Sequence, residues 1–291
     1  MIKQQDSAIT RWFRMLGLGH LAWSLRRLYC PVKKEALVLE VGSGGNPYPR
    51  ANVLLDAYED TIERYHIPLV KDRPLVFGVV ERMPFRDKAF DFVIASHVLE
   101  HSVDPVNFLR ELMRVSKAGY IETPDAFCER LIPFRFHRLE VTNEQGKIRI
   151  WKKPSWRPHG ELVDLFEKKV KGKKFIQLMQ KHPEPFYMRY YWEDSIAYEV
   201  ANPDVDASWP LPSHIAVPQQ TRSRFRDVLV RAARWTFSQA GRNKKIDVWS
   251  LLKCVKCDST NFSRTEISLS CRECGKHYAV RDGIPVMFPD M

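Results

Sequence analysis

The sequence predicts an α/β fold: a doubly wound, mostly parallel sheet with N-terminal helices and a small C-terminal domain. Three observations predict it. The 291 residues are 44% hydrophobic, enough for one full α/β domain and a small one beside it. Short apolar runs alternate with helical stretches between residues 36 and 125. Four of the six cysteines are confined to residues 254–274, where they form two Cys-x-x-Cys pairs.

The first 33 residues are expected to form a helical cap. Two stretches, 7–16 and 20–29, carry apolar residues at helical spacing. Gly17 and Gly19 lie between them as a breaker. The apolar positions are Ile9, Trp12, Phe13 and Leu16 in the first stretch and Leu21, Leu25, Leu28 and Tyr29 in the second.

Residues 34–220 are predicted to form the main domain. Five apolar runs read as strands: ALVLEV, NVLLD, PLVFGVV, FDFVIAS and GYIETPD, with the helical stretch DPVNFLRELMRVSK before the last. Residues 126–215 are less regular and contain an apparent hairpin in FYMRYYWEDSIAYEV. A long insertion after the last strand usually builds the substrate side of a pocket.

The net charge of +11 is concentrated in two flanks. Residues 1–35 carry seven Lys and Arg against two acids, and residues 222–245 carry eight against one. The rest of the chain is close to neutral. The basic character therefore belongs to the flanks and not to the main domain.

Residues 221–245 are predicted to be a basic amphipathic helix and linker. An apolar stripe is formed by Phe225, Val228, Leu229, Ala232 and Trp235, with Arg222, Arg224, Arg226, Arg231 and Arg234 around it. One interpretation is a helix packed on the domain with solvated arginines. The other is an interfacial helix that, together with Trp12, Arg14, Trp23 and Arg26-Arg27, binds an anionic membrane or a polyanionic substrate. RNA is a further candidate, which the near-neutral remainder disfavours.

The expected location is the cytoplasm, in soluble or membrane-peripheral form. No run of about 18 or more apolar residues occurs, and the start, MIKQQDSAITRWF, lacks the features of a signal peptide. Paired Cys-x-x-Cys spacing is typical of a metal site and favours a reducing compartment.

The stretch LEVGSGGNPYPRANVLLD, residues 39–56, begins like a nucleotide-binding turn. Where a helix should start after the glycines, Asn46-Pro47-Tyr48-Pro49 follows instead. A dinucleotide needs that helix, because its N-terminus faces the pyrophosphate. S-adenosylmethionine carries no phosphate and tolerates the loss. On its own, the loop is equally consistent with an ordinary strand-to-loop turn.

Two later stretches agree with this cofactor. ERMPFRDKAFDFVIASHVLEH, residues 81–101, followed by DPVNFLRELMRVSKAGYIETPD, resembles class I S-adenosylmethionine-dependent methyltransferases. The similarity is greatest to the small-molecule branch that includes the quinone methyltransferases, and it spans residues 36–125. It implies a Rossmann-like sheet and an enzyme of the transferase class.

The resemblance also implies cofactor-binding residues. The amino-acid end of the cofactor would be wrapped by Glu40, Gly42, Ser43, Gly44 and Asn46, the ribose held by Asp56, and the adenine flanked by Glu81 and Met83, with His97 beside the transferred methyl. One departure concerns adenine. The family usually has Gly-Asp where this sequence has Gly78-Val79, so either Glu81 substitutes for the acid or the backbone alone reads the base.

Methyl transfer requires a positioned acceptor and, for a hydroxyl, a base. Histidine suits that role near neutral pH. The candidates are His97, His101, His137 and His159, each of which has a structural role as its alternative. His137 is preferred, because it follows the fifth strand at the carboxyl end of the sheet. His97 to His101 also match the zinc-peptidase pattern His-x-x-Glu-His, which we interpret as a coincidence.

Some acceptors are disfavoured. Enzymes that methylate adenine or glutamine nitrogens have an Asn/Asp-Pro-Pro turn after the fourth strand, where this sequence reads Ser96-His97-Val98-Leu99. Cys128 lacks the Pro-Cys context of cytosine carbon methylation and is expected to be a buried thiol. An oxygen or a simple amine of a small molecule or a glycan, including a lipid-linked one, remains.

Residues 246–291 are predicted to form a zinc ribbon. The stretch 251–288 resembles the small activator subunit of tRNA and protein methyltransferases, and Cys254, Cys257, Cys271 and Cys274 are the expected ligands of a structural zinc. Unpaired thiols or two disulfides are the alternative. The ribbon either docks on its own domain or recruits a partner protein. A second function therefore stays open, a catalytically weak scaffold that activates a partner methyltransferase, as does a tRNA or protein methyltransferase.

Overall fold

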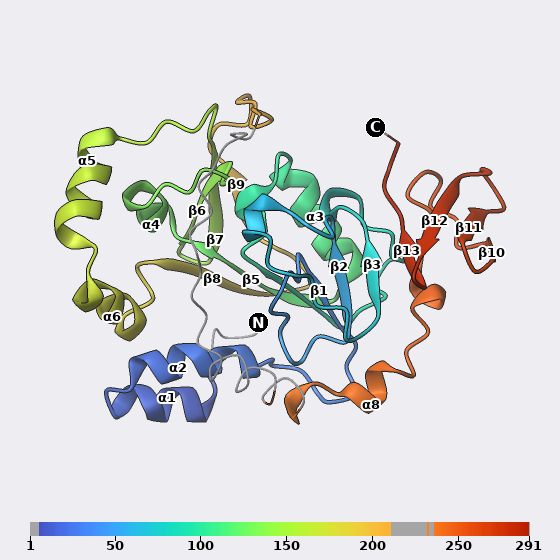
Figure 1. Cartoon of the computed structure of the whole chain (residues 1–291), viewed down its shortest axis with the longest axis horizontal. Coiled ribbons are helices and arrows are strands. Elements are labelled where there is room, and N and C mark those ends of the chain that lie inside the picture. Colours follow the sequence, from blue (N-terminus) through green and yellow to red (C-terminus); the bar gives the residue numbers. More distant parts are fainter. Residues whose placement is uncertain (1–5, 211–231, 233–235, 291) are drawn as a thin grey trace. The chain divides into compact units, whose positions relative to one another are not determined.

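A computed structural model describes residues 6–210, 232 and 236–290 (Figure 1). The chain divides into two compact units. The first unit comprises Met1–Pro31, Ala95–Pro105 and Tyr120–Ile215, and the second comprises Val32–Ile94, Val106–Gly119 and Ala216–Met291. The predicted division into four sequence segments stays a prediction.

The second unit contains the glycine-loop part of the sheet. Its strands β1 (Val38–Val41), β2 (Val53–Asp56) and β3 (Leu75–Phe77) are parallel neighbours and are buried along their whole length. Strand β4 (Phe92–Ser96) lies on the other side of β1 and continues into the first unit. Every residue of β1 to β3 packs into the core because both faces are covered, which explains their continuous apolar runs. The predicted α/β fold class is confirmed.

The connections between these strands are shorter than a doubly wound fold normally has. No helix is found among residues 42–52, and the later links hold only the 3-10 turns η2 (Ile62–Arg64), η3 (Val80–Arg82) and η4 (Leu99–His101). The first of these connections to contain an α-helix is the one between β4 and β5, which holds α3 (Pro105–Val115). The two prolines at positions 47 and 49 explain the missing first helix, because proline removes backbone donors that a helix interior needs.

The cysteine-rich segment joins the same sheet within the second unit. It comprises α8 (Ala240–Asn243), η6 (Val248–Leu251), β10 (Phe262–Arg264), β11 (Ser268–Cys271), β12 (His277–Arg281) and β13 (Ile284–Val286). Strands β10 to β13 are antiparallel, and β13 then pairs in parallel with β3. The Met287 N–H donates to the Phe77 carbonyl at 2.8 Å. The ribbon therefore covers the β3 edge of the sheet, as added strands commonly do.

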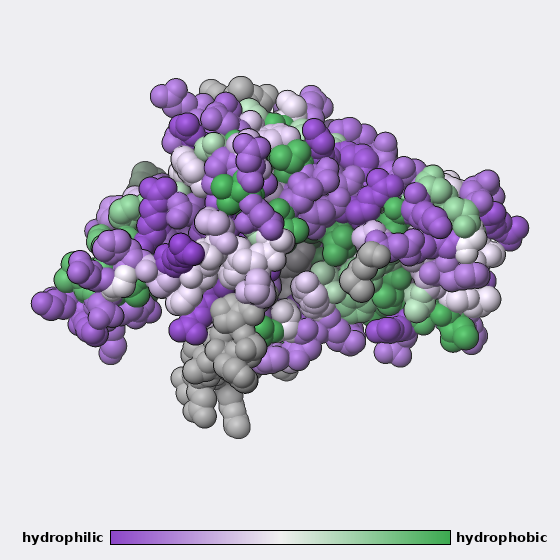
Figure 2. Space-filling view, turned by 90° about the horizontal axis from the view of Figure 1, so that it is seen from above, coloured by the Kyte–Doolittle hydropathy of each residue, from purple (hydrophilic) through white to green (hydrophobic). Residues whose placement is uncertain are grey.

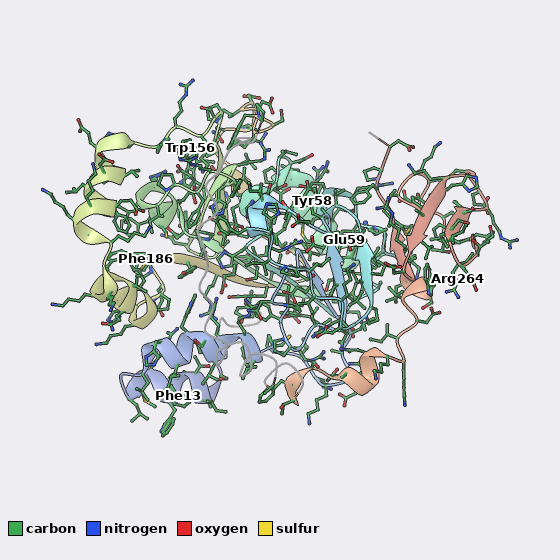
Figure 3. All side chains as sticks on the ribbon, viewed as in Figure 1. Phe13, Tyr58, Glu59, Trp156, Phe186 and Arg264 are labelled. Atoms are coloured by element: carbon green, nitrogen blue, oxygen red, sulfur yellow. The ribbon has the colours of Figure 1, made fainter. Side chains whose placement is uncertain are left out.

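The first unit combines helices with the remaining strands. Its elements are α1 (Ala8–Met15), α2 (Gly19–Leu25), η1 (Arg26–Leu28), β5 (Ala118–Pro124), α4 (Ala126–Leu131), β6 (Leu139–Glu144), β7 (Lys147–Lys152), α5 (Gly160–Leu165), the π-helical η5 (Phe166–Val170), α6 (Lys173–Lys181), β8 (Tyr187–Glu193) and β9 (Tyr198–Val200). Strand β5 lies between β4 and β8. Phe186, labelled in Figure 3, joins α4 to α6, because its ring lies 5.9 Å from Phe127 and 5.6 Å from Phe175.

The predicted hairpin over residues 186–200 is wrong. Strand β8 borders β5, whereas β9 runs parallel to β7 in a separate three-stranded sheet, β6-β7-β9. The chain bends between them at Asp194, whose φ of 61° is left-handed. The hairpin of this insertion is instead β6 to β7, which turns at Gln145 and Gly146, both with positive φ.

Both predicted N-terminal helices are confirmed as α1 and α2. The predicted basic helix over 221–245 lies largely outside the described residues. Among the residues that are described, no helix is both long enough and apolar enough to cross a membrane.

Candidate functional site

Two acids bind the backbone of the glycine loop in the second unit. Gly42 and Gly44 adopt left-handed backbone, with φ of 60° and 55°, which favours glycine. The buried Glu40 accepts a hydrogen bond from the Tyr48 N–H at 2.7 Å, so this side chain closes the loop. Asp56, at the end of β2, accepts from the Gly44 N–H at 2.9 Å.

The surroundings of the loop fit a cofactor without phosphate. A Cβ at Gly45 would overlap Ile67 and lie 2.9 Å from the Pro68 carbonyl, so only glycine allows this close packing. Within the described part of the chain, the buried Ser43 hydroxyl has no hydrogen-bond partner, although buried polar groups normally have one. An orphaned hydroxyl between two left-handed glycines, with a carboxylate on the next strand, suits the hydroxyl and amino groups of S-adenosylmethionine.

Asp56 also serves its own loop. Its carboxylate accepts from the Tyr58 N–H at 3.1 Å and pairs with Arg64 at 3.5 Å. Tyr58 is labelled in Figure 3. A ribose hydroxyl would have to share these carboxylate oxygens. The predicted ribose contact therefore involves an acid that already orders the loop.

The residues predicted to flank the adenine of the cofactor are less accessible to a ligand. The Met83 side chain is fully buried, and its N–H donates to Glu111 at 2.6 Å. Glu81 is half-buried in η3, and Asn46 is exposed. The cofactor roles of Glu81, Met83 and Asn46 stay predictions.

In the first unit, the three histidines predicted as catalytic lie in one cluster with three glutamates. The rings of His101 and His137 lie 4.8 Å apart. His97, directly after β4, has a left-handed φ of 58°, which is strained for a residue with a Cβ. The glutamates of the cluster are Glu100, Glu122 and Glu129, each at most 3% exposed. Buried acids of this kind need partners, and the histidines supply some of them.

His137 has the geometry of an oriented base. Its Nδ1 lies 2.7 Å from a Glu129 carboxylate oxygen, and the ring stacks on Phe134 with centroids 4.7 Å apart. The other Glu129 oxygen accepts from Lys153 at 2.7 Å. Burial, and then the charges of His101 and Lys153, lower the pKa of His137 well below its usual range, so the ring is neutral. Burial raises the pKa of Glu129 to about 7 despite Lys153.

His97 is unsuited to act as the base. Its two ring nitrogens lie 3.3 Å from Glu100 and 3.4 Å from Glu122. Burial lowers the pKa of His97, but these two acids outweigh it and raise the pKa to about 9. At neutral pH His97 is therefore a cation.

Arg26 completes the charge balance. It binds Glu122 through two nitrogens, at 2.6 and 3.0 Å, and lies over the Trp23 ring at 3.5 Å. Arg26 and Trp23 thus have partners inside the first unit, and their predicted role at a membrane stays a prediction. Three cations, Arg26, Lys153 and protonated His97, face the three glutamates.

Ligand atoms of Glu100, His101 and His137 all lie within 4.8 Å of one another, so this trio can also approach one metal ion. The charge balance favours a proton-handling site instead, because a divalent ion would compete with protonated His97 for Glu100. His159 is not part of the cluster. It caps α5, where its Nδ1 accepts from the Leu162 N–H at 3.4 Å.

The sequence prediction missed Glu122, Glu129, Lys153 and the role of Arg26. Glu122 had a visible signal, because it is the one charged residue in the otherwise uncharged strand β5. Arg26 had no such signal in the sequence, since it lies 96 positions from its partner Glu122.

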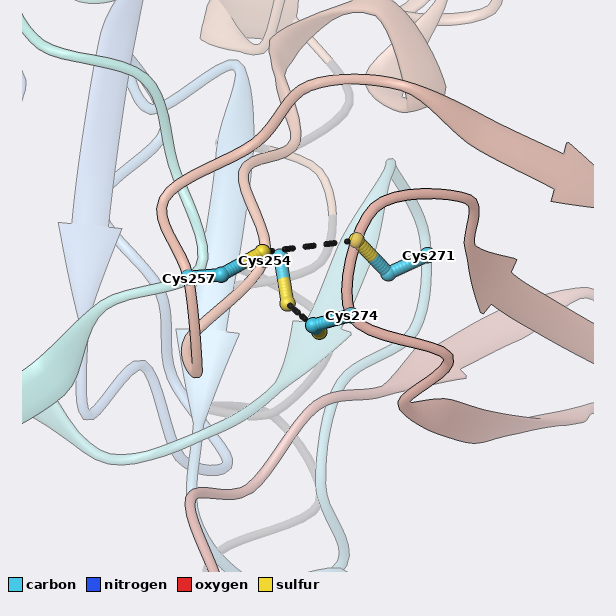
Figure 4. A group of neighbouring side chains, drawn as sticks. All are labelled: Cys254, Cys257, Cys271 and Cys274. Atoms are coloured by element: carbon cyan, nitrogen blue, oxygen red, sulfur yellow. Dashed lines mark hydrogen bonds between the residues drawn. The ribbon is translucent and has the colours of Figure 1, made fainter.

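The four predicted metal-ligating cysteines converge (Figure 4). The sulfurs of Cys254 and Cys274 are 3.6 Å apart, and those of Cys257 and Cys271 are 3.5 Å apart. Tetrahedral zinc with bonds of about 2.3 Å places its sulfurs about 3.8 Å apart. The donor set therefore fits zinc. None of the four forms a disulfide.

Tyr278 prepares one of these thiols. Its hydroxyl lies 3.0 Å from Cys254 Sγ. Burial raises the pKa of Cys254, but hydrogen bonds from Tyr278 and from the backbone N–H groups of Cys257 and Lys256 outweigh it and lower the pKa to about 6. A thiolate is the form that binds metal.

Residues 39–121 match the family model described as a methyltransferase domain. The match begins in β1 and ends in β5. It confirms the predicted S-adenosylmethionine-dependent methyltransferase class for this part of the chain. No curated protein matches the sequence.

Solved structures give weaker likenesses. The YcgJ protein of Bacillus subtilis is 22% identical, over 36% of this chain and 51% of its own, with a TM-score of 0.28. This chain therefore spans about half the length of that protein. A Thermotoga maritima S-adenosylmethionine-dependent methyltransferase is 22% identical, over 42% and 58%, with a TM-score of 0.29. The complex of the Haloferax volcanii Trm112 methyltransferase activator with its companion chain gives 12%, over 65% and 95%, with a TM-score of 0.37.

Proposed function

We propose that this protein is an S-adenosylmethionine-dependent methyltransferase that acts on an oxygen, or an amine, of a small-molecule or glycan acceptor, including a lipid-linked one. The observation that carries the proposal is the buried, neutral His137 held by Glu129 at 2.7 Å. The methyltransferase match of residues 39–121 supports the transfer class. A neutral imidazole with one nitrogen fixed by a carboxylate is suited to removing a proton from a hydroxyl.

The cofactor would be held by the backbone of Gly42 and Gly44, the Ser43 hydroxyl and the Asp56 carboxylate. When bound, it supplies a methyl group activated by the sulfonium. His137 supplies the base. With Nδ1–H donated to Glu129, the lone pair of Nε2 accepts the acceptor proton, and Glu129 stabilises the imidazolium that forms.

We also propose that the four cysteines hold a structural zinc ion. All four ligand positions are taken by protein, so the ion has no open site for catalysis. Two alternative functions have less support, because β13 already pairs with β3 of its own chain. One is a catalytically weak scaffold that activates a partner methyltransferase. The other is a tRNA or protein methyltransferase. We also propose that the protein is located in the cytoplasm, in membrane-peripheral form.

Incubation with radiolabelled S-adenosylmethionine tests the acceptor class. Small-metabolite, glycan-lipid and tRNA fractions are offered separately to the purified protein. Label in the metabolite or glycan-lipid fraction is expected. Label confined to RNA or protein would contradict the proposed acceptor, and cofactor binding without any turnover would support the scaffold.

Asp56→Asn is expected to weaken S-adenosylhomocysteine binding about tenfold to a hundredfold, because a charged hydrogen-bond acceptor contributes about 1.5–3 kcal/mol. Isothermal titration calorimetry measures it. Asp60→Asn, four residues later, is the matched control, since the exposed Asp60 pairs only with His66 among the described residues. Equal affinity in the Asp56 variant and the wild type, with both folded by circular dichroism, would remove Asp56 from the site.

Methyl transfer is expected to fall as the pH drops through about 7. Glu129 has its pKa raised to about 7, so below this pH it is protonated. A protonated Glu129 donates to Nδ1 of His137, which moves the ring proton to Nε2 and removes the base. The profile of kcat/KM against pH measures this. Glu129→Gln, which cannot ionise, should flatten the acid limb, and an unchanged limb would show that another group titrates.

A further inference from the structure

Helix α1 presents its apolar side outward. Its large exposed apolar residues are Ile9 at 62%, Trp12 at 53% and Met15 at 78%, and the adjacent Leu16 is 53% exposed. The residue that points inward is polar: Thr10 is fully buried, and its hydroxyl bonds the Ser7 hydroxyl at 2.8 Å. A surface helix of a globular protein normally buries its apolar stripe. This one does the reverse.

Polar contacts hold the helix in this orientation. Asp6, just before α1, pairs with the buried Arg189 at 3.1 Å and with Arg14 at 3.1 Å. Arg14 also pairs with Glu184 at 2.6 Å. These ion pairs fix the polar side of α1 to the first unit. The outward position of the apolar stripe is thus built into the fold.

The neighbouring helices add positive charge. Within the first unit α2 lies between α1 and α6, so α1 is the outermost of the three (Figure 1). Segment 168–181, which comprises the end of η5 and all of α6, has six lysines and no acid. Lys168 and Lys171 pair with acids one turn before them. Among the described residues, Lys169, Lys173, Lys174 and Lys181 are exposed and make no ion pair.

Apolar residues accompany these lysines. Leu165, Val170, Ile176 and Leu178 are each more than 40% exposed. Figure 2 shows small hydrophobic patches among hydrophilic side chains at the left of the view, on the side where α5 and α6 lie. The first unit therefore combines exposed apolar side chains, an exposed tryptophan and lysines that make no ion pair among the described residues.

We propose that α1, supported by the lysines of 168–181, binds the surface of an anionic lipid bilayer. An outward apolar stripe with Trp12 at its centre suits the boundary between headgroups and acyl chains. The lysines suit the negative potential of anionic lipids. The proposed surface shares Trp12 with the one that the sequence predicted and adds the lysines of 168–181. The proposal is independent of the transfer reaction, because lipid binding needs no cofactor.

Co-sedimentation of the full chain with vesicles tests the proposal. Phosphatidylcholine vesicles with and without phosphatidylglycerol are compared, at low and high salt. The wild type is expected to bind the anionic vesicles, and salt is expected to weaken binding. The double variant Trp12→Asp, Met15→Asp should bind at least about tenfold more weakly. Ile267→Asp is the matched control, because Ile267 is 78% exposed, like Met15, but lies in the second unit.

One further variant tests the role of the lysines, and two measurements identify other occupants of the apolar stripe. Lys173→Glu with Lys174→Glu should remove most of the salt-dependent part of binding and leave folding unchanged by circular dichroism. Failure of the wild type to bind anionic vesicles overturns the proposal. If in that case the wild type is a dimer by light scattering and the Trp12, Met15 variant a monomer, a second copy covers the stripe. If the variant instead lowers the Tm of a monomer, another segment of the chain covers it.

Discussion

His137→Asn lowers kcat/KM for methyl transfer by about a hundredfold to ten-thousandfold, which is the usual contribution of a general base. The asparagine amide can still donate to Glu129 from the position of Nδ1, so the Glu129–Lys153 pair keeps its partner. What disappears is Nε2, the atom proposed to accept the proton. Because the acceptor keeps its binding site, the loss should fall on kcat more than on KM.

The control variants separate this role from stability. His159→Asn changes an exposed histidine that caps α5 and should leave the rate unchanged. His97→Asn removes a cation between Glu100 and Glu122 and should lower the Tm, because two buried acids lose a partner. Wild-type turnover by a folded His137→Asn protein would show that the base lies elsewhere, and S-adenosylhomocysteine affinity checks that the cofactor site is intact.

The parts of the fold that the sequence predicted best are those fixed by local pattern. The five apolar runs form β1 to β5, and the helical stretch before the last is α3. The prolines at 47 and 49 also indicated correctly that no helix follows the glycines. Short-range chemistry decides these features. The hairpin over 186–200 failed because β8 and β9 have similar strand-forming sequences and their partners, β5 and β7, are chosen by tertiary contacts.

The candidate site was predicted in part for the same reason. His97, His101 and His137 follow strands at the carboxyl end of the sheet, so topology brings them together. Their charge states could not be predicted. The pKa of His97 depends on Glu122, and that acid depends on Arg26, which comes from the N-terminal helices. The periodicity of 7–16 likewise predicted a helix with one apolar side but did not decide whether that side faces outward.

The ribbon illustrates a second limit. Its cysteine spacing predicted the four convergent sulfurs, because each Cys-x-x-Cys pair sits on one tight turn. Its docking was left open between its own domain and a partner. In the structure β13 pairs with β3 of the same chain, through residues 77 and 286, and recruitment of a partner protein stays a prediction. No local pattern encodes such a distant partner.

Cys271→Ser is expected to abolish metal binding and to unfold the ribbon. Structural zinc contributes about 10–16 kcal/mol of apparent binding free energy in small zinc domains, far more than a core of this size supplies. Loss of the ribbon would also uncover β3. Ile284, Val286 and Phe288 pack on the core cluster of Ala51, Leu54, Leu75 and Phe77. The Tm of the second unit should therefore fall, and amide exchange in β3 should rise.

Metal analysis and chelation keep this prediction testable if the variant aggregates. The wild type should contain about one zinc per chain, since four thiolates complete one tetrahedron, and a chelator should release it with the same rise in β3 exchange. Cys30→Ser is the matched control, because this half-buried cysteine belongs to the first unit and is not one of the four ligands. If the chelator leaves the Tm of the wild type unchanged, the ribbon is stable without metal. Tyr278, the sulfur contacts and the β13 pairing would then be enough to stabilise it. Zinc retained by Cys271→Ser would mean that three thiolates suffice, which leaves a coordination position open for a fourth ligand.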